Sequence, residues 1–421
     1  MGTKPQTIKM AIKTMIKHLF LLLITLSAHA QTRVLFIGNS YTGANSLPSM
    51  VEDVAQSAGY SFANTALTPG GATLYQHTQN ASTYTAMANQ NWDFIVFQAQ
   101  SQEPAFPWGQ VNFQTLPYAD ELVDSARSIA PCAQPTFFRT WGRKNGDQWN
   151  CAAFPPLCTY EGMDSLLHLR YRMMADSNDA LLSPVGSVWR YIRDTDTTIE
   201  LYTADESHPS LAGSYAAACT FFTIFTRQDP SLITDDKNLN PLVAATIRQA
   251  TKTVVYDSLL VWNVGKFDVT ADLSYTISRD TLTFTSTSTY ADSIYIDFGD
   301  GNGTSAPSGQ HYYMQDDFFT VTISAFKCDQ VDTSAYTVQS IVIFGVEEHE
   351  IQALKHPSQV INKWPQQLER LSIFSLTGQE IWTTNYQNRT SYPDLPVGAY
   401  IMECHWKSGR KTAEKFGVLP E

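Results

Sequence analysis

Short apolar runs alternate with longer amphipathic segments from Arg33 to Trp262. The runs RVLFIG, DFIVFQ and PTFFRTW are typical of strands buried on both faces of a sheet. In the intervening segments apolar residues recur at spacings of three and four, which is the period of an amphipathic helix. Strands that alternate with helices predict an α/β fold, a parallel sheet covered by helices on both faces. Ligands of such sheets bind at the carboxyl ends of the strands.

The helix after the first strand is expected to begin at Asn45 and Ser46, because these residue types cap helix N-termini. Leu47, Met50 and Val51 then start its apolar face. The segment SLAGSYAAACTFFTIF, starting at Ser210, is almost wholly apolar and predicts a largely buried helix.

The pattern changes to a period of two over residues 266–344, which is typical of antiparallel strands in a β-sandwich. The run DFGDGNG, followed by HYY and FTVTISAF, resembles PKD domains, Ig-like modules common on secreted bacterial proteins. Asp297 and Asp300 in this run could bind calcium, but a glycine-rich turn between strands is the favoured interpretation.

The last segment resembles the C-terminal sorting domain of type IX secretion substrates, with a second Ig-like spacer as the alternative. The resemblance is carried by the turn Thr377-Gly378-Gln379 and the segment Leu395 to Tyr400, although His356-Pro357 stands where Asn-Pro is usual. It implies the export machinery as a partner. The predicted organisation is a signal peptide (1–30), an α/β domain (31–264), a PKD-like sandwich (265–345) and a sorting-type β domain (346–421).

The N-terminus predicts export. Four lysines precede the apolar run LFLLLITL, and the small residues Ala28 and Ala30 suit cleavage after Ala30. An uncleaved anchor is the alternative, but the apolar run is short for a span, which needs about 20 residues. No later segment is a membrane-span candidate, so we expect a secreted or cell-surface bacterial protein. Cysteines in an exported chain permit disulfides, and Cys151 and Cys158, which bracket CAAFPPLC, are predicted to form one.

Composition weighs against nucleic-acid binding. The chain has 421 residues with 40 acidic and 28 basic side chains, a net charge of −12. A nucleic-acid binder needs a basic surface to meet phosphates, and no basic cluster lies outside the N-terminus.

Three residues far apart in the chain suggest nucleophilic catalysis. Ser40 ends the first strand in VLFIGNSYT, and Asp205 and His208 stand three apart in TADESHPS, just before a helix. A serine hydroxyl is a poor nucleophile unless a base takes its proton. Histidine is a natural base near neutral pH, and a carboxylate fixes its tautomer. Pro209 holds His208 in extended geometry at the helix start.

GNSYT together with DESHPS resembles the SGNH hydrolases, also called GDSL esterases, over residues 32–262. The resemblance implies a three-layer α/β/α flavodoxin-like fold, with Ser40 as nucleophile, His208 as base and then acid, and Asp205 as its orienting partner. It implies no metal and no cofactor. The backbone N–H groups of Ser40 and Gly71 would form an oxyanion hole.

The third block of that family usually supplies an asparagine to the oxyanion hole, but this chain has QAQSQEP there. Counting from Asp93 places Gln102 at the asparagine position and Gln100 at the glycine position. Either glutamine could donate, and the sequence leaves the choice open.

Three further residues are candidates for substrate contact: His77, Trp141 and Arg143. The favoured interpretation of His77 is a satisfied polar residue near the site, and that of Arg143 is a surface position, whereas Trp141 could equally belong to the core. The favoured function is a secreted serine esterase that removes acetyl groups from carbohydrates. Esterase activity on lipid or other small acyl esters is the alternative within the class. A non-catalytic glycan-binding or adhesin protein on a hydrolase-like scaffold is the alternative outside it.

Overall fold

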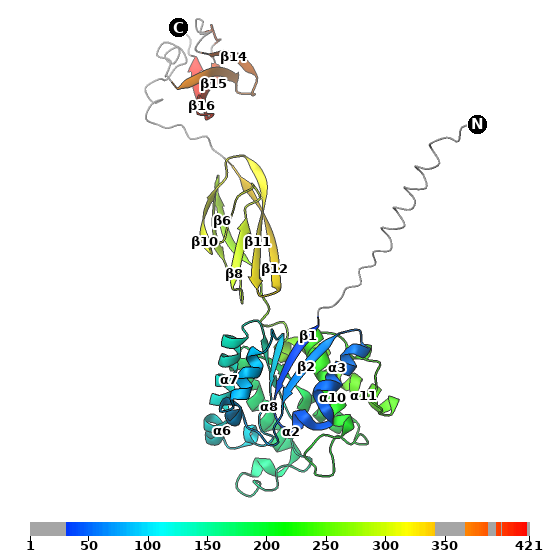
Figure 1. Cartoon of the computed structure of the whole chain (residues 1–421). Helices are drawn as coiled ribbons and strands as arrows, with labels where there is room; N and C mark the ends of the chain where they lie inside the picture. The colour runs from blue at the N-terminus through cyan, green and yellow to red at the C-terminus, as the bar shows by residue number, and fades with distance from the viewer. Residues whose placement is uncertain (1–30, 342–366, 386–392, 397, 419–421) are drawn as a thin grey trace, which may run out of the picture. The chain divides into compact units, whose positions relative to one another are not determined.

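The computed structural model describes residues 31–341, 367–385, 393–396 and 398–418 (Figure 1). The chain divides into two compact units, Met1–Asp268 and Val269–Glu421. The predicted signal peptide and the dipeptide His356-Pro357 lie outside the described residues. No helix in the described part of the chain is long and apolar enough to span a bilayer.

The first unit is built on a five-stranded parallel sheet, in the order β2-β1-β3-β4-β5. This is the flavodoxin-like strand order, and the predicted α/β fold class is confirmed. β1, β3 and β4 coincide with the three predicted strands, whereas the edge strands β2 and β5 were not predicted. The strands are β1 (Thr32–Ile37), β2 (Phe62–Leu67), β3 (Phe94–Phe97), β4 (Gln134–Phe138) and β5 (Leu181–Ser183).

Helices cover both faces of this sheet (Figure 1). From β1 the chain first adds β2 on one side of β1, and it then adds β3, β4 and β5 in turn on the other side. Because crossovers are right-handed, α3 lies on one face and the helices between β2 and β5 on the other. α9, α10 and α11 pack with α3 or with one another to complete the first layer. The helices are α2 (Ser40–Gly43), α3 (Leu47–Ser57), α4 (Leu74–Thr78), α5 (Ala81–Ala88), α6 (Trp108–Gln114), α7 (Leu116–Ile129), α8 (Tyr160–Ser177), α9 (Val185–Thr195), α10 (Leu211–Thr226) and α11 (Pro241–Val254), with short 3-10 turns η1 (Ala44–Ser46), η2 (Glu103–Ala105), η3 (Pro155–Cys158), η4 (Pro230–Leu232) and η5 (Tyr256–Trp262).

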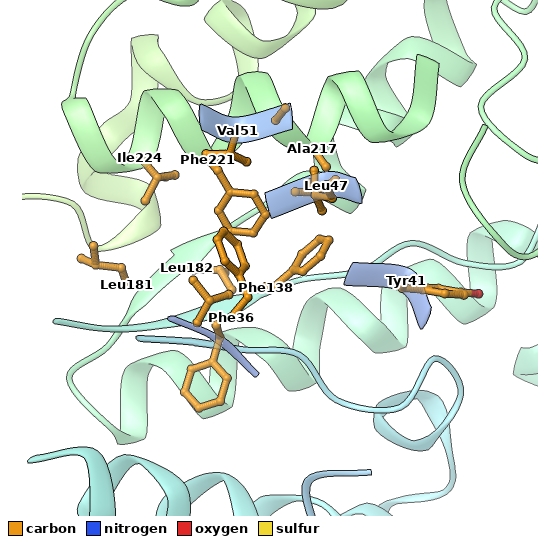
Figure 2. Packing of buried hydrophobic residues seen from close by; sticks show 14 of the residues in the cluster. Phe36, Tyr41, Leu47, Val51, Phe138, Leu181, Leu182, Ala217, Phe221 and Ile224 are labelled. Carbon is orange, nitrogen blue, oxygen red and sulfur yellow. The ribbon is translucent and has the colours of Figure 1, made fainter. Parts of the chain in front are cut away.

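The core of the first unit centres on α10, whose residues from Ala212 to Phe225 are all buried, as predicted. Phe221 meets Phe36 of β1 and Phe138 of β4 edge to face, at centroid distances of 5.2 and 5.0 Å (Figure 2). Fully burying one such side chain contributes about 1.5–3 kcal/mol. This packing holds α10, which begins three residues after His208, against the sheet.

The second unit begins with a β-sandwich, in agreement with the predicted alternating pattern. Its two antiparallel sheets have the orders β10-β7-β6 and β12-β11-β8-β9. The Asp297 and Asp300 side chains accept hydrogen bonds from Gly299 N and Asn302 N, and so stabilise the turn after β8. The strands are β6 (Leu273–Ser278), β7 (Thr281–Ser286), β8 (Ser293–Asp297), β9 (Gly303–Thr304), β10 (Ser308–Tyr312), β11 (Asp317–Lys327) and β12 (Gln330–Ser340).

The C-terminal described residues form an antiparallel sheet in the order β14-β13-β15-β16. Its strands are β13 (Leu368–Ser375), β14 (Glu380–Asn385), β15 (Gly398–Trp406) and β16 (Lys411–Val418). The predicted turn at Gly378 joins β13 to β14, and its φ of 83° is one that glycine adopts without strain.

Candidate active site

Ser40 lies at the carboxyl end of β1 and is the first residue of α2. Asn39 caps this short helix, since its side chain accepts a hydrogen bond from Tyr41 N at 3.1 Å. Gly38 has no room for a side chain, because a Cβ would lie 2.5 Å from Thr42 Oγ1. The chain therefore turns tightly out of the sheet and leaves Ser40 partly exposed at its rim.

The structure brings His208 and Asp205 to Ser40. His208 Nε2 lies 2.9 Å from Ser40 Oγ, and His208 Nδ1 lies 2.5 Å from Asp205 Oδ2. Because a carboxylate only accepts, the hydrogen of the imidazole sits on Nδ1 and the Nε2 lone pair faces the hydroxyl.

Asp205 is held by several donors. Its Oδ1 accepts from His208 N at 2.9 Å, Ser207 N at 3.0 Å and Thr203 Oγ1 at 2.8 Å. Desolvation raises the pKa of this carboxyl, but the hydrogen bonds from His208, Ser207 and Thr203 outweigh it and hold the pKa below its usual range. Asp205 therefore stays ionised beside the imidazole at neutral pH.

Asn45 joins the nucleophile segment to the histidine segment. Its Nδ2 contacts Pro209 O and Ser210 O, each at 3.1 Å, and Ser214 Oγ at 2.8 Å. As predicted, α3 begins at Leu47 with Ser46 at its N-cap position, but Ser46 makes no side-chain capping bond, and both Asn45 and Ser46 have left-handed backbones. The Asn45 amide instead fixes Ser40 and His208 relative to each other.

A stack of three aromatic rings supports the same corner. Tyr41 stacks on Trp141 at 4.8 Å, and Trp141 stacks on Trp189 at 3.8 Å. Trp141 Nε1 donates to Ser207 O at 3.0 Å, and Tyr41 Oη lies 2.7 Å from Ser207 Oγ. Trp141 is 0% exposed, so of the two interpretations open from the sequence the core position holds, and the residue supports the loop that carries His208.

Two buried polar side chains lie beneath the nucleophile. Gln98 Oε1 accepts from Asn39 N and Thr42 Oγ1, both at 2.9 Å. His77 Nε2 donates to Gly38 O at 2.8 Å, and burial lowers the pKa of this histidine, which favours its neutral form. His77 is 1% exposed, so it is a satisfied buried polar residue that supports the turn, and not a substrate contact. Gln98 was missed, although a polar residue that ends an apolar strand was a visible signal.

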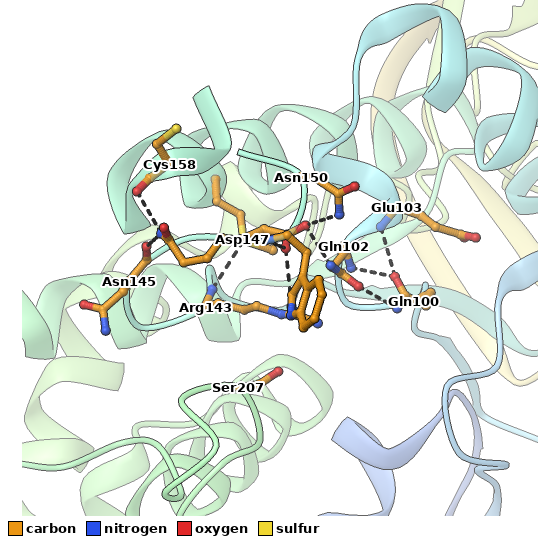
Figure 3. A network of polar contacts seen from close by, with 12 residues as sticks. Gln100, Gln102, Glu103, Arg143, Asn145, Asp147, Asn150, Cys158 and Ser207 are labelled. Atoms are coloured by element: carbon orange, nitrogen blue, oxygen red, sulfur yellow. Dashed lines mark hydrogen bonds and ion pairs between the residues drawn. The ribbon is translucent and has the colours of Figure 1, made fainter. Parts of the chain in front are cut away.

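The predicted oxyanion-hole loops lie close to this corner. Asn39 Nδ2 donates to Ala72 O at 3.0 Å, which brings the residue after Gly71 beside the neighbour of Ser40. Gly71 has a φ of 70°, which favours glycine. Gln100 Oε1 accepts from Gln102 N at 2.7 Å, and Gln102 Nε2 donates to Asp147 Oδ2 at 2.7 Å (Figure 3).

Arg143 belongs to the loop after β4. Its Nη1 lies 3.4 Å from Asp147 Oδ1, and its side chain is 22% exposed. Burial raises the pKa of Tyr41, and the positive charge of Arg143 partly offsets this rise. The same loop contains the disulfide between Cys151 and Cys158. Among the residues the structure describes, no group of three or more His, Cys, Asp or Glu could hold a metal ion.

Similar solved structures cover either the first unit or the sandwich. A candidate SGNH hydrolase from Slackia heliotrinireducens is 29% identical, with a TM-score of 0.37, over 46% of this chain and 97% of that chain. A DUF4886 family protein from Bacteroides uniformis is 18% identical, with a TM-score of 0.47, over 55% of this chain and 95% of that chain. The PKD1 domain of a Vibrio cholerae metalloprotease is 19% identical, with a TM-score of 0.17, over 18% of this chain and 99% of that chain. No protein-family model and no curated protein matches the chain, so we infer the chemistry from the geometry of the site.

Proposed function

We propose that this protein is a serine esterase in which Ser40 is the nucleophile, His208 the general base and then acid, and Asp205 the residue that orients the imidazole. The observation that carries the proposal is the unbroken contact from Ser40 Oγ to His208 Nε2 at 2.9 Å and from His208 Nδ1 to Asp205 Oδ2 at 2.5 Å. Such a relay activates a hydroxyl that is otherwise unreactive.

The reaction proceeds through an acyl-enzyme. Ser40 Oγ attacks the ester carbonyl while its proton moves to His208 Nε2, and the carbonyl oxygen becomes an oxyanion. The intermediate collapses, and the departing alkoxide takes the proton from His208 as it leaves. A water molecule then attacks the acyl carbonyl and gives one proton to His208. The bond between the acyl group and Ser40 Oγ breaks, His208 returns the proton to Ser40 Oγ, and the carboxylic acid leaves.

The oxyanion is proposed to be held by the N–H groups of Ser40 and Gly71 and by a glutamine amide after β3. Each such donor contributes about 3 kcal/mol at the transition state. Arg143 is proposed to contact the substrate, since it is the partly exposed cation beside Tyr41.

Acetyl groups on carbohydrates are the proposed substrate, with lipid or small acyl esters as the alternative within the class. Support for a polymer substrate comes from the signal-peptide pattern of residues 1–30 and from the sandwich after the first unit, as in modular extracellular enzymes. Comparing initial rates on acetylated xylan, 4-nitrophenyl acetate and a long-chain 4-nitrophenyl ester decides among them. Hydrolysis of the long-chain ester alone would refute the carbohydrate assignment.

The test of the catalytic proposal is the Ser40→Ala variant beside Ser82→Ala, an exposed serine on α5 that serves as the matched control. We expect Ser40→Ala to lose hydrolysis of 4-nitrophenyl acetate by roughly 10⁴-fold or more, together with labelling by a fluorophosphonate probe. Ser82→Ala should retain both. Turnover by Ser40→Ala would refute the nucleophile, and a wild-type chain that binds glycan but never labels would be the binding protein instead.

Export is a separate part of the proposal. Residues 1–30 are proposed to be a signal peptide and residues 346–421 a sorting domain read by the type IX machinery. N-terminal sequencing of the exported protein should begin at Gln31. Deletion of residues 346–421 should retain the protein in the periplasm, and normal export of that variant would contradict the sorting role.

A further inference from the structure

We propose that Asp147 is a positioning residue for the oxyanion hole, and that its buried carboxylate orients the Gln102 amide so that one N–H of this amide points to the acyl oxygen. The proposal rests on the proposed esterase function and identifies Gln102, rather than Gln100, as the donor after β3.

Asp147 is a buried carboxylate that is fully supplied with donors. It is 0% exposed. Its Oδ2 accepts from Gln102 Nε2 at 2.7 Å and Asn150 Nδ2 at 2.6 Å, and its Oδ1 accepts from Arg143 Nη1 at 3.4 Å and Trp149 N at 3.3 Å. Burying a charge is costly unless donors replace its water, and here four donors do so. The carboxylate is therefore a fixed acceptor.

Gln102 is the one of these four donors that comes from outside the loop of Asp147. Gln102 follows β3 at the carboxyl ends of the strands, where Ser40 follows β1, and β1 and β3 are neighbouring strands. Figure 3 shows the Gln102 side chain reaching across to Asp147. This hydrogen bond thus connects the loop after β4 with the segment in which a third-block donor is expected.

The negative charge decides which way the amide faces. A carboxylate accepts but never donates, so Gln102 must present Nε2 to Asp147, and its Oε1 turns toward Gln100 Nε2 at 3.4 Å. One N–H of the amide is used by Asp147, and the second remains for another acceptor. A flipped amide would bring its oxygen to the oxyanion, which would repel it.

Gln100 is less suited to the role. Its Oε1 accepts from Gln102 N at 2.7 Å and from Glu103 N at 3.1 Å, so its side chain is folded back on its own segment. This arrangement shapes the turn that presents Gln102.

The tether also explains how a glutamine can stand where an asparagine is usual. Its extra methylene adds a rotatable bond, and immobilising such a side chain on binding costs conformational entropy. Asp147 supplies this ordering before substrate binds. The carboxylate itself is held firmly, because Asp147 N donates to Leu157 O at 2.7 Å and Cys151 N donates to Asp147 O at 2.9 Å, within the loop that the disulfide with Cys158 closes.

The experiment is a double-mutant cycle on the full chain, with Asp147→Asn, Gln102→Ala and the double variant assayed on 4-nitrophenyl acetate. Asparagine keeps the shape of the Asp147 side chain, but its amide can turn an N–H toward Gln102. The Gln102 amide is then no longer held in one orientation. We expect Asp147→Asn to lower kcat roughly 10- to 100-fold with KM changed less than about threefold, since one oxyanion donor is worth about 10²–10³ in kcat. In the Gln102→Ala background the same substitution should have almost no further effect.

Losses that multiply in the double variant would overturn the proposal, as would a raised KM with an unchanged kcat. Gln148→Ala, an exposed change in the same loop, controls for general loosening and should retain kcat. If Asp147→Asn does not fold, Gln102→Ala still decides: full kcat in that variant refutes the donor. Failure of the esterase proposal is distinct, because it would show as absent fluorophosphonate labelling of the wild type.

Discussion

Replacing Glu103 with glutamine should stabilise the first unit at alkaline pH and leave it unchanged at acidic pH. Glu103 Oε2 is buried without a hydrogen-bond partner among the described residues, and burial raises the pKa of this carboxyl from 4.5 to about 7. The folded state therefore holds the proton more tightly than the unfolded state. This contribution to stability is fully present below pH 4.5 and is lost as pH rises through 7.

The magnitude follows from the size of the shift. A rise in pKa from 4.5 to about 7, at about 1.4 kcal/mol for each pH unit, amounts to about 3.5 kcal/mol at pH 8, which is an upper bound because the residue is only partly buried. Glu103→Gln removes the charge without changing the shape. The variant should exceed the wild type in free energy of unfolding by up to this amount at pH 8 and by almost nothing at pH 4.

The assay is urea unfolding of the full chain between pH 4 and pH 8, followed by tryptophan fluorescence, in which the first unit contributes six tryptophans of the nine in the chain. The difference between variant and wild type isolates Glu103 from carboxyls such as Asp205, whose lowered pKa acts in the opposite direction. Glu121→Gln on the exposed face of α7 is the control. An equal difference at both pH values would refute the reasoning.

Three further changes test the geometry of the site and its loop. Asp205→Asn should lower kcat roughly 10⁴-fold at neutral pH with the fold intact, because the imidazole loses its tautomer, and near-normal turnover would contradict its role. Gly38→Ala should destabilise the protein by about 1–3 kcal/mol in thermal unfolding, because a Cβ would lie 2.7 Å from Gln98 Oε1; an unchanged melting temperature would show that the turn adapts. Replacing Cys151 and Cys158 with serine should cost about 2.5 kcal/mol in urea unfolding, from the entropy of the opened loop, and no loss would mean that the loop is ordered without the bond.

The parts of the fold that could be predicted are those whose environment is uniform along the chain. β1, β3 and β4 are central strands with both faces buried, so apolarity alone marks them. β2, with the sequence FANTAL, is a half-polar edge strand, and β5 spans three residues. Both segments are strands because the neighbouring strand, β1 or β4, supplies hydrogen-bond partners for their backbones. The local sequence pattern contains no information about such a neighbour.

The candidate site divides in the same way. Ser40, Asp205 and His208 were predicted because each sits in a local segment whose chemistry is readable. Gln98 and Asn45 act through partners 56 to 169 positions away, which no local spacing reveals. Trp141 and His77 were candidates for substrate contact because the sequence does not show which way a side chain after a strand or in a short helix points, and the structure buries both.

The burial of α10 has a consequence for motion at the site. His208 stands two residues before Ser210, whose Oγ caps α10 by accepting from Gly213 N at 3.1 Å, and the helix that follows is the most deeply packed in the first unit. The segment that carries His208 can therefore move only slightly unless the packing of α10 is lost and the first unit unfolds. Amide protons at the start of α10 should exchange with deuterium about as slowly as those of the central strands, by global opening rather than local fraying.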